Sequence, residues 1–323
     1  MRLGVFSVIL AGEPFDKALK YLAGQGVTAV EIGCGGYPGA AHCNAGELLG
    51  NEGKIKDLKK TVEDNGMIIS ALSTHGNPVH PSRETAQKFH DDFENAVKLA
   101  GKLGVETVIT FSGCPGDHDG AKYPNWVTCP WPEDFLEVLK YQWDGVLIPY
   151  WKKEAEFAKN HGVKNIAIEM HPGFCVYNPE TLLRLRNAVD GCTIGANFDP
   201  SHLWWQGIDP VRAIIDLGRA IQHFHAKDVR TDPYNTASNG VLDTKHYTEE
   251  LARSWIFRSV GYGHDLQTWR DIVSALRLVG YDCVMSIEHE DSLMTPTEGL
   301  EKAIAFLKDA IIFQPKPSSI SWA

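Results

Sequence analysis

The chain has 323 residues, of which 43% are hydrophobic and 22% are charged, and its formal net charge is −10. The acidic balance excludes the usual nucleic-acid-binding protein, because the sequence contains no run of lysine and arginine that would form a concentrated basic surface. No apolar stretch approaches the roughly 20 residues of a membrane span. The composition is that of a soluble globular protein.

The first segment, MRLGVFSVIL, lacks the small-residue cleavage site and the long apolar region of a secretory signal. We therefore expect a cytoplasmic protein. The seven cysteines are scattered, odd in number and without a C-x-x-C pair. This pattern predicts buried, reduced thiols and argues against a disulfide framework or a zinc ribbon.

Strand-like and helix-like segments alternate along the whole chain. Eight segments rich in Val, Ile and Phe are typical of strands: 3–10, 27–34, 67–74, 105–112, 165–170, 193–198, 221–226 and 283–288. Apolar residues recur at helical spacing between them, and several of these helical stretches end on a glycine: Gly26, Gly66, Gly104, Gly162 and Gly280.

Eight strand–helix repeats predict an α/β fold, a (β/α)8 TIM barrel, with residues 1–311 as a single domain and 312–323 as a C-terminal extension. An open doubly wound sheet is the alternative. A dinucleotide site has little support, because no G-x-G-x-x-G opens a helix after the first strand.

Two connections are longer than a barrel requires, about 112–132 and about 228–264. Both follow the C-terminal ends of predicted strands, where the catalytic loops of barrels lie, so we expect them to form walls of the site. Both contain aromatic residues, which argues against disorder. These aromatic side chains either stack on a ligand or anchor the loops to the barrel or to a neighbouring subunit.

Four polar residues lie at or next to the C-terminal ends of the last four predicted strands: Glu169, Asp199, His225 and Glu288. In a parallel barrel these ends face one rim, so we expect the four side chains to converge. Three carboxylates with one imidazole and no thiolate suit Mn²⁺, Mg²⁺, Co²⁺ or Zn²⁺. An ion of this kind can hold two neighbouring oxygens of a sugar and acidify the C–H bond beside its carbonyl.

The segments IAIEMHPG, NFDPSHLWW, HFHAKD and GYDCVMSIEHED resemble the xylose isomerase-like TIM-barrel superfamily of sugar isomerases and epimerases. The resemblance covers about residues 1–311. It implies that Glu169, Asp199, His225 and Glu288 bind one divalent ion, with Mn²⁺ expected and Mg²⁺, Co²⁺ or Zn²⁺ as alternatives. It also implies that Glu169 and Glu288 are the acid and base of the reaction.

Further candidates surround this set. His171 lies two residues beyond Glu169 and is an alternative base. Four residues are expected to contact the substrate: His202, His75, Lys227 and Arg230. The expected position for a substrate-binding arginine holds Thr231, with Arg230 one residue earlier, so the substrate contacts are expected to differ from those of ketohexose epimerases. His223 is expected to point to the face of its strand opposite that of His225.

We therefore expect an isomerase or epimerase that acts on a sugar or keto-sugar through an enediolate-like intermediate. A lyase, either a keto-polyol dehydratase or a C-glycoside-cleaving subunit, is the alternative, because its first step is the same deprotonation. A non-catalytic sugar-binding or assembly subunit is a further alternative. The expected partner is a small-molecule sugar, with a homo-oligomer or a partner subunit left open.

Overall fold

The computed structural model describes residues 1–317. Eight parallel strands close into a barrel in the order β1-β10-β7-β6-β5-β4-β3-β2. The strands are β1 (Arg2–Phe6), β2 (Ala29–Gly33), β3 (Ile68–Ser73), β4 (Thr107–Phe111), β5 (Asn165–Glu169), β6 (Ile194–Phe198), β7 (Ile221–Ala226) and β10 (Val284–Ile287). The predicted TIM barrel is confirmed.

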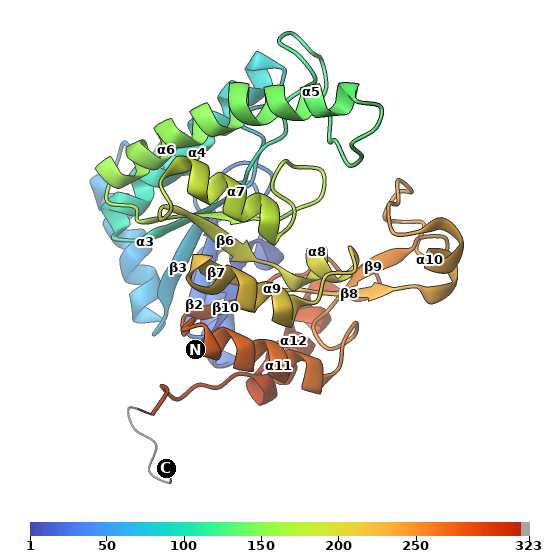
Figure 1. Ribbon diagram of the computed structural model, residues 1–323. Helices are drawn as coiled ribbons and strands as arrows, with labels where there is room; N and C mark the ends of the chain where they lie inside the picture. The colour runs from blue at the N-terminus through green and yellow to red at the C-terminus, as the bar shows by residue number, and fades with distance from the viewer. Residues whose placement is uncertain (318–323) are drawn as a thin grey trace.

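A helix follows each barrel strand, and together these helices surround the barrel (Figure 1). They are α1 (Phe15–Gly24), α3 (Glu52–Asp64), α4 (Arg83–Leu103), α6 (Ile148–Asn160), α7 (Pro179–Val189), α9 (Pro210–Leu217), α11 (Leu266–Leu278) and α12 (Pro296–Ala310). Shorter helical segments are η1 (Ser7–Leu10), α2 (Ala45–Leu48), α5 (Asp134–Lys140), η2 (Tyr141–Leu147), α8 (Pro200–Trp204), η3 (Gly218–Ala220) and α10 (Pro233–Asn239). Within the described residues, no helix is long and apolar enough to cross a membrane.

Hydrophobic packing between the strands and the helices forms one large core. Phe93 of α4 and Trp151 of α6 are fully buried there, with their rings edge to face at 5.5 Å. The five glycines expected to end helices all have positive φ angles, which agrees with their predicted place. This core covers the outside of the barrel and leaves its interior to the residues that alternate along each strand.

Two details differ from the sequence-based expectation. The first strand ends at Phe6, and Ser7–Leu10 is a 3₁₀ helix, because a short apolar run is compatible with either structure. Four cysteines are buried free thiols, whereas Cys129, Cys192 and Cys283 are exposed ones. Of the predicted C-terminal extension, residues 318–323 lie outside the described residues.

The long connection after β7 contains a hairpin that the sequence did not predict. Strands β8 (Asp228–Thr231) and β9 (Trp255–Arg258) pair antiparallel and, with α10, project from the barrel (Figure 1). The Asp228 carboxylate accepts hydrogen bonds from the backbone N–H groups of Gly261, Gly263 and His264 at 3.0–3.2 Å. Asp228 therefore fixes the return of this connection over the barrel rim.

Candidate metal and substrate site

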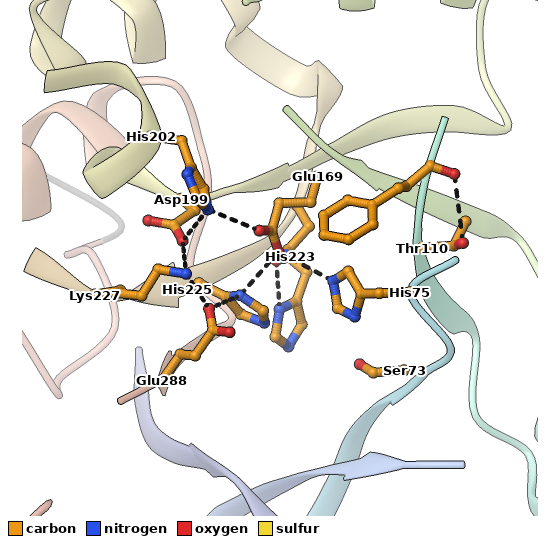
Figure 2. A network of polar contacts seen from close by, with 12 residues as sticks. Ser73, His75, Thr110, Glu169, Asp199, His202, His223, His225, Lys227 and Glu288 are labelled. Atoms are coloured by element: carbon orange, nitrogen blue, oxygen red, sulfur yellow. Dashed lines mark hydrogen bonds and ion pairs between the residues drawn. The ribbon is translucent and has the colours of Figure 1, made fainter. Parts of the chain in front are cut away.

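The four predicted metal ligands converge at the C-terminal ends of neighbouring strands. Glu169 ends β5, His225 is the penultimate residue of β7, and Asp199 and Glu288 directly follow β6 and β10. One donor atom from each side chain lies within 4.8 Å of the others. Figure 2 shows these side chains facing one another.

Several atoms of this cluster are buried without a hydrogen-bond partner. Within the described residues these include Asp199 Oδ2, Glu288 Oε2 and His225 Nδ1. His225 Nδ1 lies 2.9 Å from Glu288 Oε2 and 3.1 Å from Glu169 Oε2, but neither contact has hydrogen-bond geometry. Buried polar atoms without hydrogen bonds are costly, and a cation among them would contact all three, in addition to the ion pairs of Asp199 Oδ2 and Glu288 Oε2 with Lys227. The donor set therefore fits a divalent ion.

Lys227 supplies a buried positive charge beside the cluster. Its ammonium group lies 3.1 Å from Asp199 Oδ2, 3.0 Å from Glu288 Oε2 and 3.1 Å from Glu290 Oε2. Burial alone would lower the pKa of Lys227, but these carboxylates outweigh it and raise the pKa well above its ordinary value. Lys227 therefore stays charged and offsets part of the negative charge of the site.

The carboxylates of the cluster have different pKa values. Burial raises the pKa of Asp199 to about 7, although Lys227 opposes the shift. Burial would also raise the pKa of Glu288, but Lys227 and His225 outweigh it, and the net shift is downward. Burial would raise the pKa of Glu169 too, but the neighbouring side chains of His202 and His225 outweigh it and hold the pKa well below its ordinary value. Glu169 and Glu288 are therefore carboxylates at neutral pH.

A second buried layer lies beneath the cluster, and its central residue, Glu31 of β2, was not predicted. Glu31 is fully buried and accepts hydrogen bonds from Ser73, from Ser286 at 2.7 Å and from His225 Nε2 at 3.0 Å. With Nε2 donating to Glu31, Nδ1 is the ring nitrogen that faces the cluster. Burial alone would lower the pKa of His225, but Glu31 and Glu288 outweigh it and raise the pKa well above its ordinary value, so a bound ion would take the place of the proton on Nδ1. The charged residue inside the apolar strand AVEIG was the available signal for this position.

The expected orientation of His223 is wrong. Its ring lies inside the barrel, where Nδ1 is 3.0 Å from Asn197 Oδ1 and Nε2 is 3.2 Å from Ser70 Oγ. Side chains two residues apart on a strand share a face, so His223 and His225 both point inward. Asn197 also donates to Glu169 Oε2 at 2.9 Å, which makes it a second contact that sequence reasoning missed.

Three of the other predicted histidines lie at the site. His75 Nε2 is 3.1 Å from Glu169 Oε2, and His202 Nε2 is 3.2 Å from Glu169 Oε1. The His171 ring lies 4.0 Å from the His202 ring, and burial lowers the pKa of His171, which favours its neutral form. Arg230 is not brought to the site, since it is exposed on β8 and lines none of the cavities described below.

A cavity of about 470 Å³ opens above the cluster. Its polar lining includes Glu169, Glu288, Lys227 and His171, whereas Asp199 and His225 do not line it. Its apolar lining comes from aromatic residues including Phe6, Tyr37, Phe111 and Phe174. Two of the four candidate ligands are thus open to a bound molecule, and the other two lie beneath them.

Residues 19–310 match the family model of the xylose isomerase-like TIM barrel. The chain belongs to this family. One relative of this chain is the uncharacterised protein YfiH of Bacillus subtilis strain 168. It is 42% identical over 96% of this chain and 99% of its own length. The inosose dehydratase of Geobacillus thermodenitrificans strain NG80-2 is 24% identical over 86% of this chain and 87% of its own.

Solved structures of similar fold include the probable 3-DHS dehydratase AsbF of Bacillus anthracis, with a TM-score of 0.65, 17% identity and coverage of 95% and 99% of the two chains. D-psicose 3-epimerase has a TM-score of 0.63 at 14% identity, covering 96% and 99%. The IolI protein, solved with a zinc atom, has a TM-score of 0.65 at 18% identity, covering 96% and 98%. At these identities the likeness shows the fold, which carries dehydratases as well as epimerases.

Proposed function

We propose that the protein is a divalent-metal-dependent isomerase or epimerase of a sugar or keto-sugar. The observation that carries the proposal is that Glu169 and Glu288, alone among the four candidate ligands, line the cavity. Both carboxylates also lie within 3.1 Å of His225 Nδ1. A sugar in the cavity would therefore meet two carboxylates at the point where the ion would be held.

Glu169, Asp199, His225 through Nδ1, and Glu288 would hold the ion. We propose Mn²⁺, and the same oxygen-rich donor set also suits Mg²⁺, Co²⁺ and Zn²⁺. The bound ion would polarise the sugar carbonyl and acidify the adjacent C–H bond. The convergence of three buried donor atoms that lack hydrogen bonds supports this assignment.

One of the two carboxylates takes the proton from the carbon beside the carbonyl, and the other returns a proton to the resulting enediolate. His75, Asn197 and His202 surround Glu169 and fix its orientation. Lys227 keeps Glu288 ionised until it receives a proton. His171, neutral and in the cavity wall, is the alternative base.

Solvent exchange tests this function. Mn²⁺-loaded protein is incubated in D₂O with a panel of ketohexoses and inososes, and deuterium at the carbon beside the ketone is followed by NMR. We expect exchange with at least one substrate, and losses of at least about 100-fold in Glu169→Gln and Glu288→Gln. The matched control is Glu63→Gln, at an exposed position of α3. Exchange at the wild-type rate in both site variants would remove the proposed mechanism.

A dehydratase is the second candidate, and the relatives named inosose dehydratase favour it. Elimination would begin with the same proton abstraction, and Lys227 would stabilise the negative charge that develops on the departing hydroxyl. Mass spectrometry of the products separates the two candidates. An isomerase or epimerase conserves the substrate mass, whereas a dehydratase removes one water.

A further inference from the structure

An aromatic hollow adjoins the cavity above the carboxylate cluster, and we propose that this hollow binds a planar apolar group attached to the sugar substrate. The proposal deepens the proposed function and rests on it only in placing the sugar at the cluster. The aromatic hollow has a volume of about 380 Å³, and the residues that line it include Trp126, Trp205, Leu242, Tyr247 and Phe257. A single hexose at the cluster would leave it empty.

The hollow adjoins the cluster cavity, because the two share a lining residue. His171 lines both of them, and it also lines a third hollow of about 280 Å³ between them. This middle hollow shares Glu290 with the cluster cavity, and it shares Tyr247 and Phe257 with the aromatic hollow. One extended ligand can therefore reach from the carboxylates to the aromatic hollow.

Both long connections build the walls of this hollow. Trp126 comes from the segment 112–132, and Leu242 and Tyr247 come from the segment 228–264. Stacking fixes the orientation of two aromatic side chains in the wall, since the Trp205 and Trp255 rings are 4.5 Å apart and nearly parallel, at 8°. Trp255 Nε1 also donates to the backbone oxygen of Val241 at 3.0 Å. The surface is thus ordered in advance of binding, which reduces the entropic cost of binding.

The polar groups of the hollow favour an apolar occupant over a second sugar. The Asp243 carboxylate is already paired with Lys245 at 2.8 Å and with the Ser254 N–H at 2.7 Å. Within the described residues, the indole N–H groups of Trp126 and Trp205 are buried without an acceptor. The lining is mostly aromatic and apolar, so a planar apolar group buries more apolar surface there than a second pyranose, whose several hydroxyls would need partners.

The test compares three β-D-glucosides that differ only in the group attached to the anomeric oxygen. Isothermal titration of the Mn²⁺-loaded full-length protein measures methyl β-D-glucopyranoside, 4-nitrophenyl β-D-glucopyranoside and cellobiose. We expect the nitrophenyl glucoside to bind at least about tenfold more tightly than the methyl glucoside, and cellobiose to show no such gain. Equal affinities for the two glucosides, no detectable binding of either, or an equal gain with cellobiose would overturn the proposal.

Two variants test whether the preference for the nitrophenyl glucoside arises in the aromatic hollow. Trp126→Ala is expected to remove most of the tenfold preference, and Leu242→Ala is expected to reduce it. Leu242 is 62% exposed, so its loss leaves the core intact. The control is Trp131→Ala in the same segment, because Trp131 is 74% exposed and does not line the hollow. A preference that survives both Trp126→Ala and Leu242→Ala would contradict the assignment.

The same titrations in EDTA separate this inference from the proposed function. A nitrophenyl preference that persists while EDTA leaves all affinities unchanged would support the aromatic hollow and count against the metal site. Sugar binding that needs Mn²⁺ but shows no nitrophenyl preference would support the metal site and overturn the aromatic hollow.

Discussion

Two buried polar layers lie on top of each other in the barrel, and they differ in how their atoms are satisfied. In the lower layer, both oxygens of Glu31 and both ring nitrogens of His223 have hydrogen-bond partners. In the upper layer, Asp199, Glu288 and His225 each keep a buried atom without a hydrogen bond, and two of these atoms have Lys227 as an ion-pair partner. The hydrogen bonds of the lower layer are therefore satisfied by protein groups alone, whereas the upper layer has donor atoms of the kind that bind a cation.

The largest expected effect separates the layers by stability. In EDTA, Glu31→Gln should lower the free energy of unfolding by about 3 kcal/mol, because an amide cannot accept from all the donors that Glu31 satisfies. Asp199→Asn, an equivalent change in the upper layer, should alter it by less than about 1 kcal/mol. Oδ1 still accepts from the Ser201 N–H, and Lys227, which loses Asp199 Oδ2, keeps its ion pairs with Glu288 and Glu290. Urea unfolding followed by circular dichroism measures both. An equal loss of unfolding free energy in the two variants would contradict the proposed difference between the layers.

Metal binding should complete the upper layer and stabilise the fold. Mn²⁺ at 100 times its Kd should add about 2.7 kcal/mol to the free energy of unfolding. The increase in Tm should disappear on adding EDTA and in Asp199→Asn. Differential scanning calorimetry provides the measurement, and Glu63→Gln is the control. If Mn²⁺ left the Tm of the wild type unchanged, the assignment of the upper layer as a metal site would be contradicted.

The lower layer should tune the upper one through His225. Glu31→Gln removes the negative charge that raises the basicity of the imidazole, so we expect a 10- to 100-fold weaker affinity for Mn²⁺. Isothermal titration measures the affinity, at a temperature where circular dichroism shows the variant to be folded. An unchanged Kd in the folded variant would mean that Glu31 serves stability alone.

A buried carboxylate outside both layers, Glu154 of α6, extends the comparison, because one of its oxygens has no hydrogen-bond partner. Burial, followed by the charge of Glu94, raises the pKa of Glu154 to about 7. The folded protein therefore binds this proton more tightly than the unfolded chain, and the stabilisation present below about pH 4.5 is lost as the pH rises through 7.

Glu154→Gln keeps an uncharged side chain at every pH. We expect the variant to match the wild type near pH 4.5 and to exceed its free energy of unfolding by about 1–2 kcal/mol at pH 8. Glu156→Gln, at an exposed position of the same helix, should show no such gain. Urea unfolding at the two pH values is the measurement, and a gain that does not depend on pH would refute the interpretation.

The sequence predicted the outline of the fold and the members of the upper layer, because both follow from local patterns. Eight apolar runs alternate with helical ones, and polar residues at strand ends meet at one rim of a parallel barrel. The metal-binding role of Glu169, Asp199, His225 and Glu288 stays a prediction.

The lower layer was missed because its partners are distant in the chain. Glu31 and Ser286 come from strands at opposite ends of the sequence, and only the closure of the barrel places them together. The orientation of His223 was accessible from the two-residue period of a strand and was misread. The hairpin β8–β9 was missed because its two strands have only four residues each and are separated by the residues 232–254 of a long connection.

Elemental analysis of the purified protein tests the central claim most directly. The wild type and Glu63→Gln, incubated with Mn²⁺ and dialysed, should each retain about one equivalent of divalent metal per chain. Glu169→Gln, prepared in parallel, should retain little. No metal in the wild type after incubation, or the same content in Glu169→Gln, would contradict the assignment of the upper layer as a metal site.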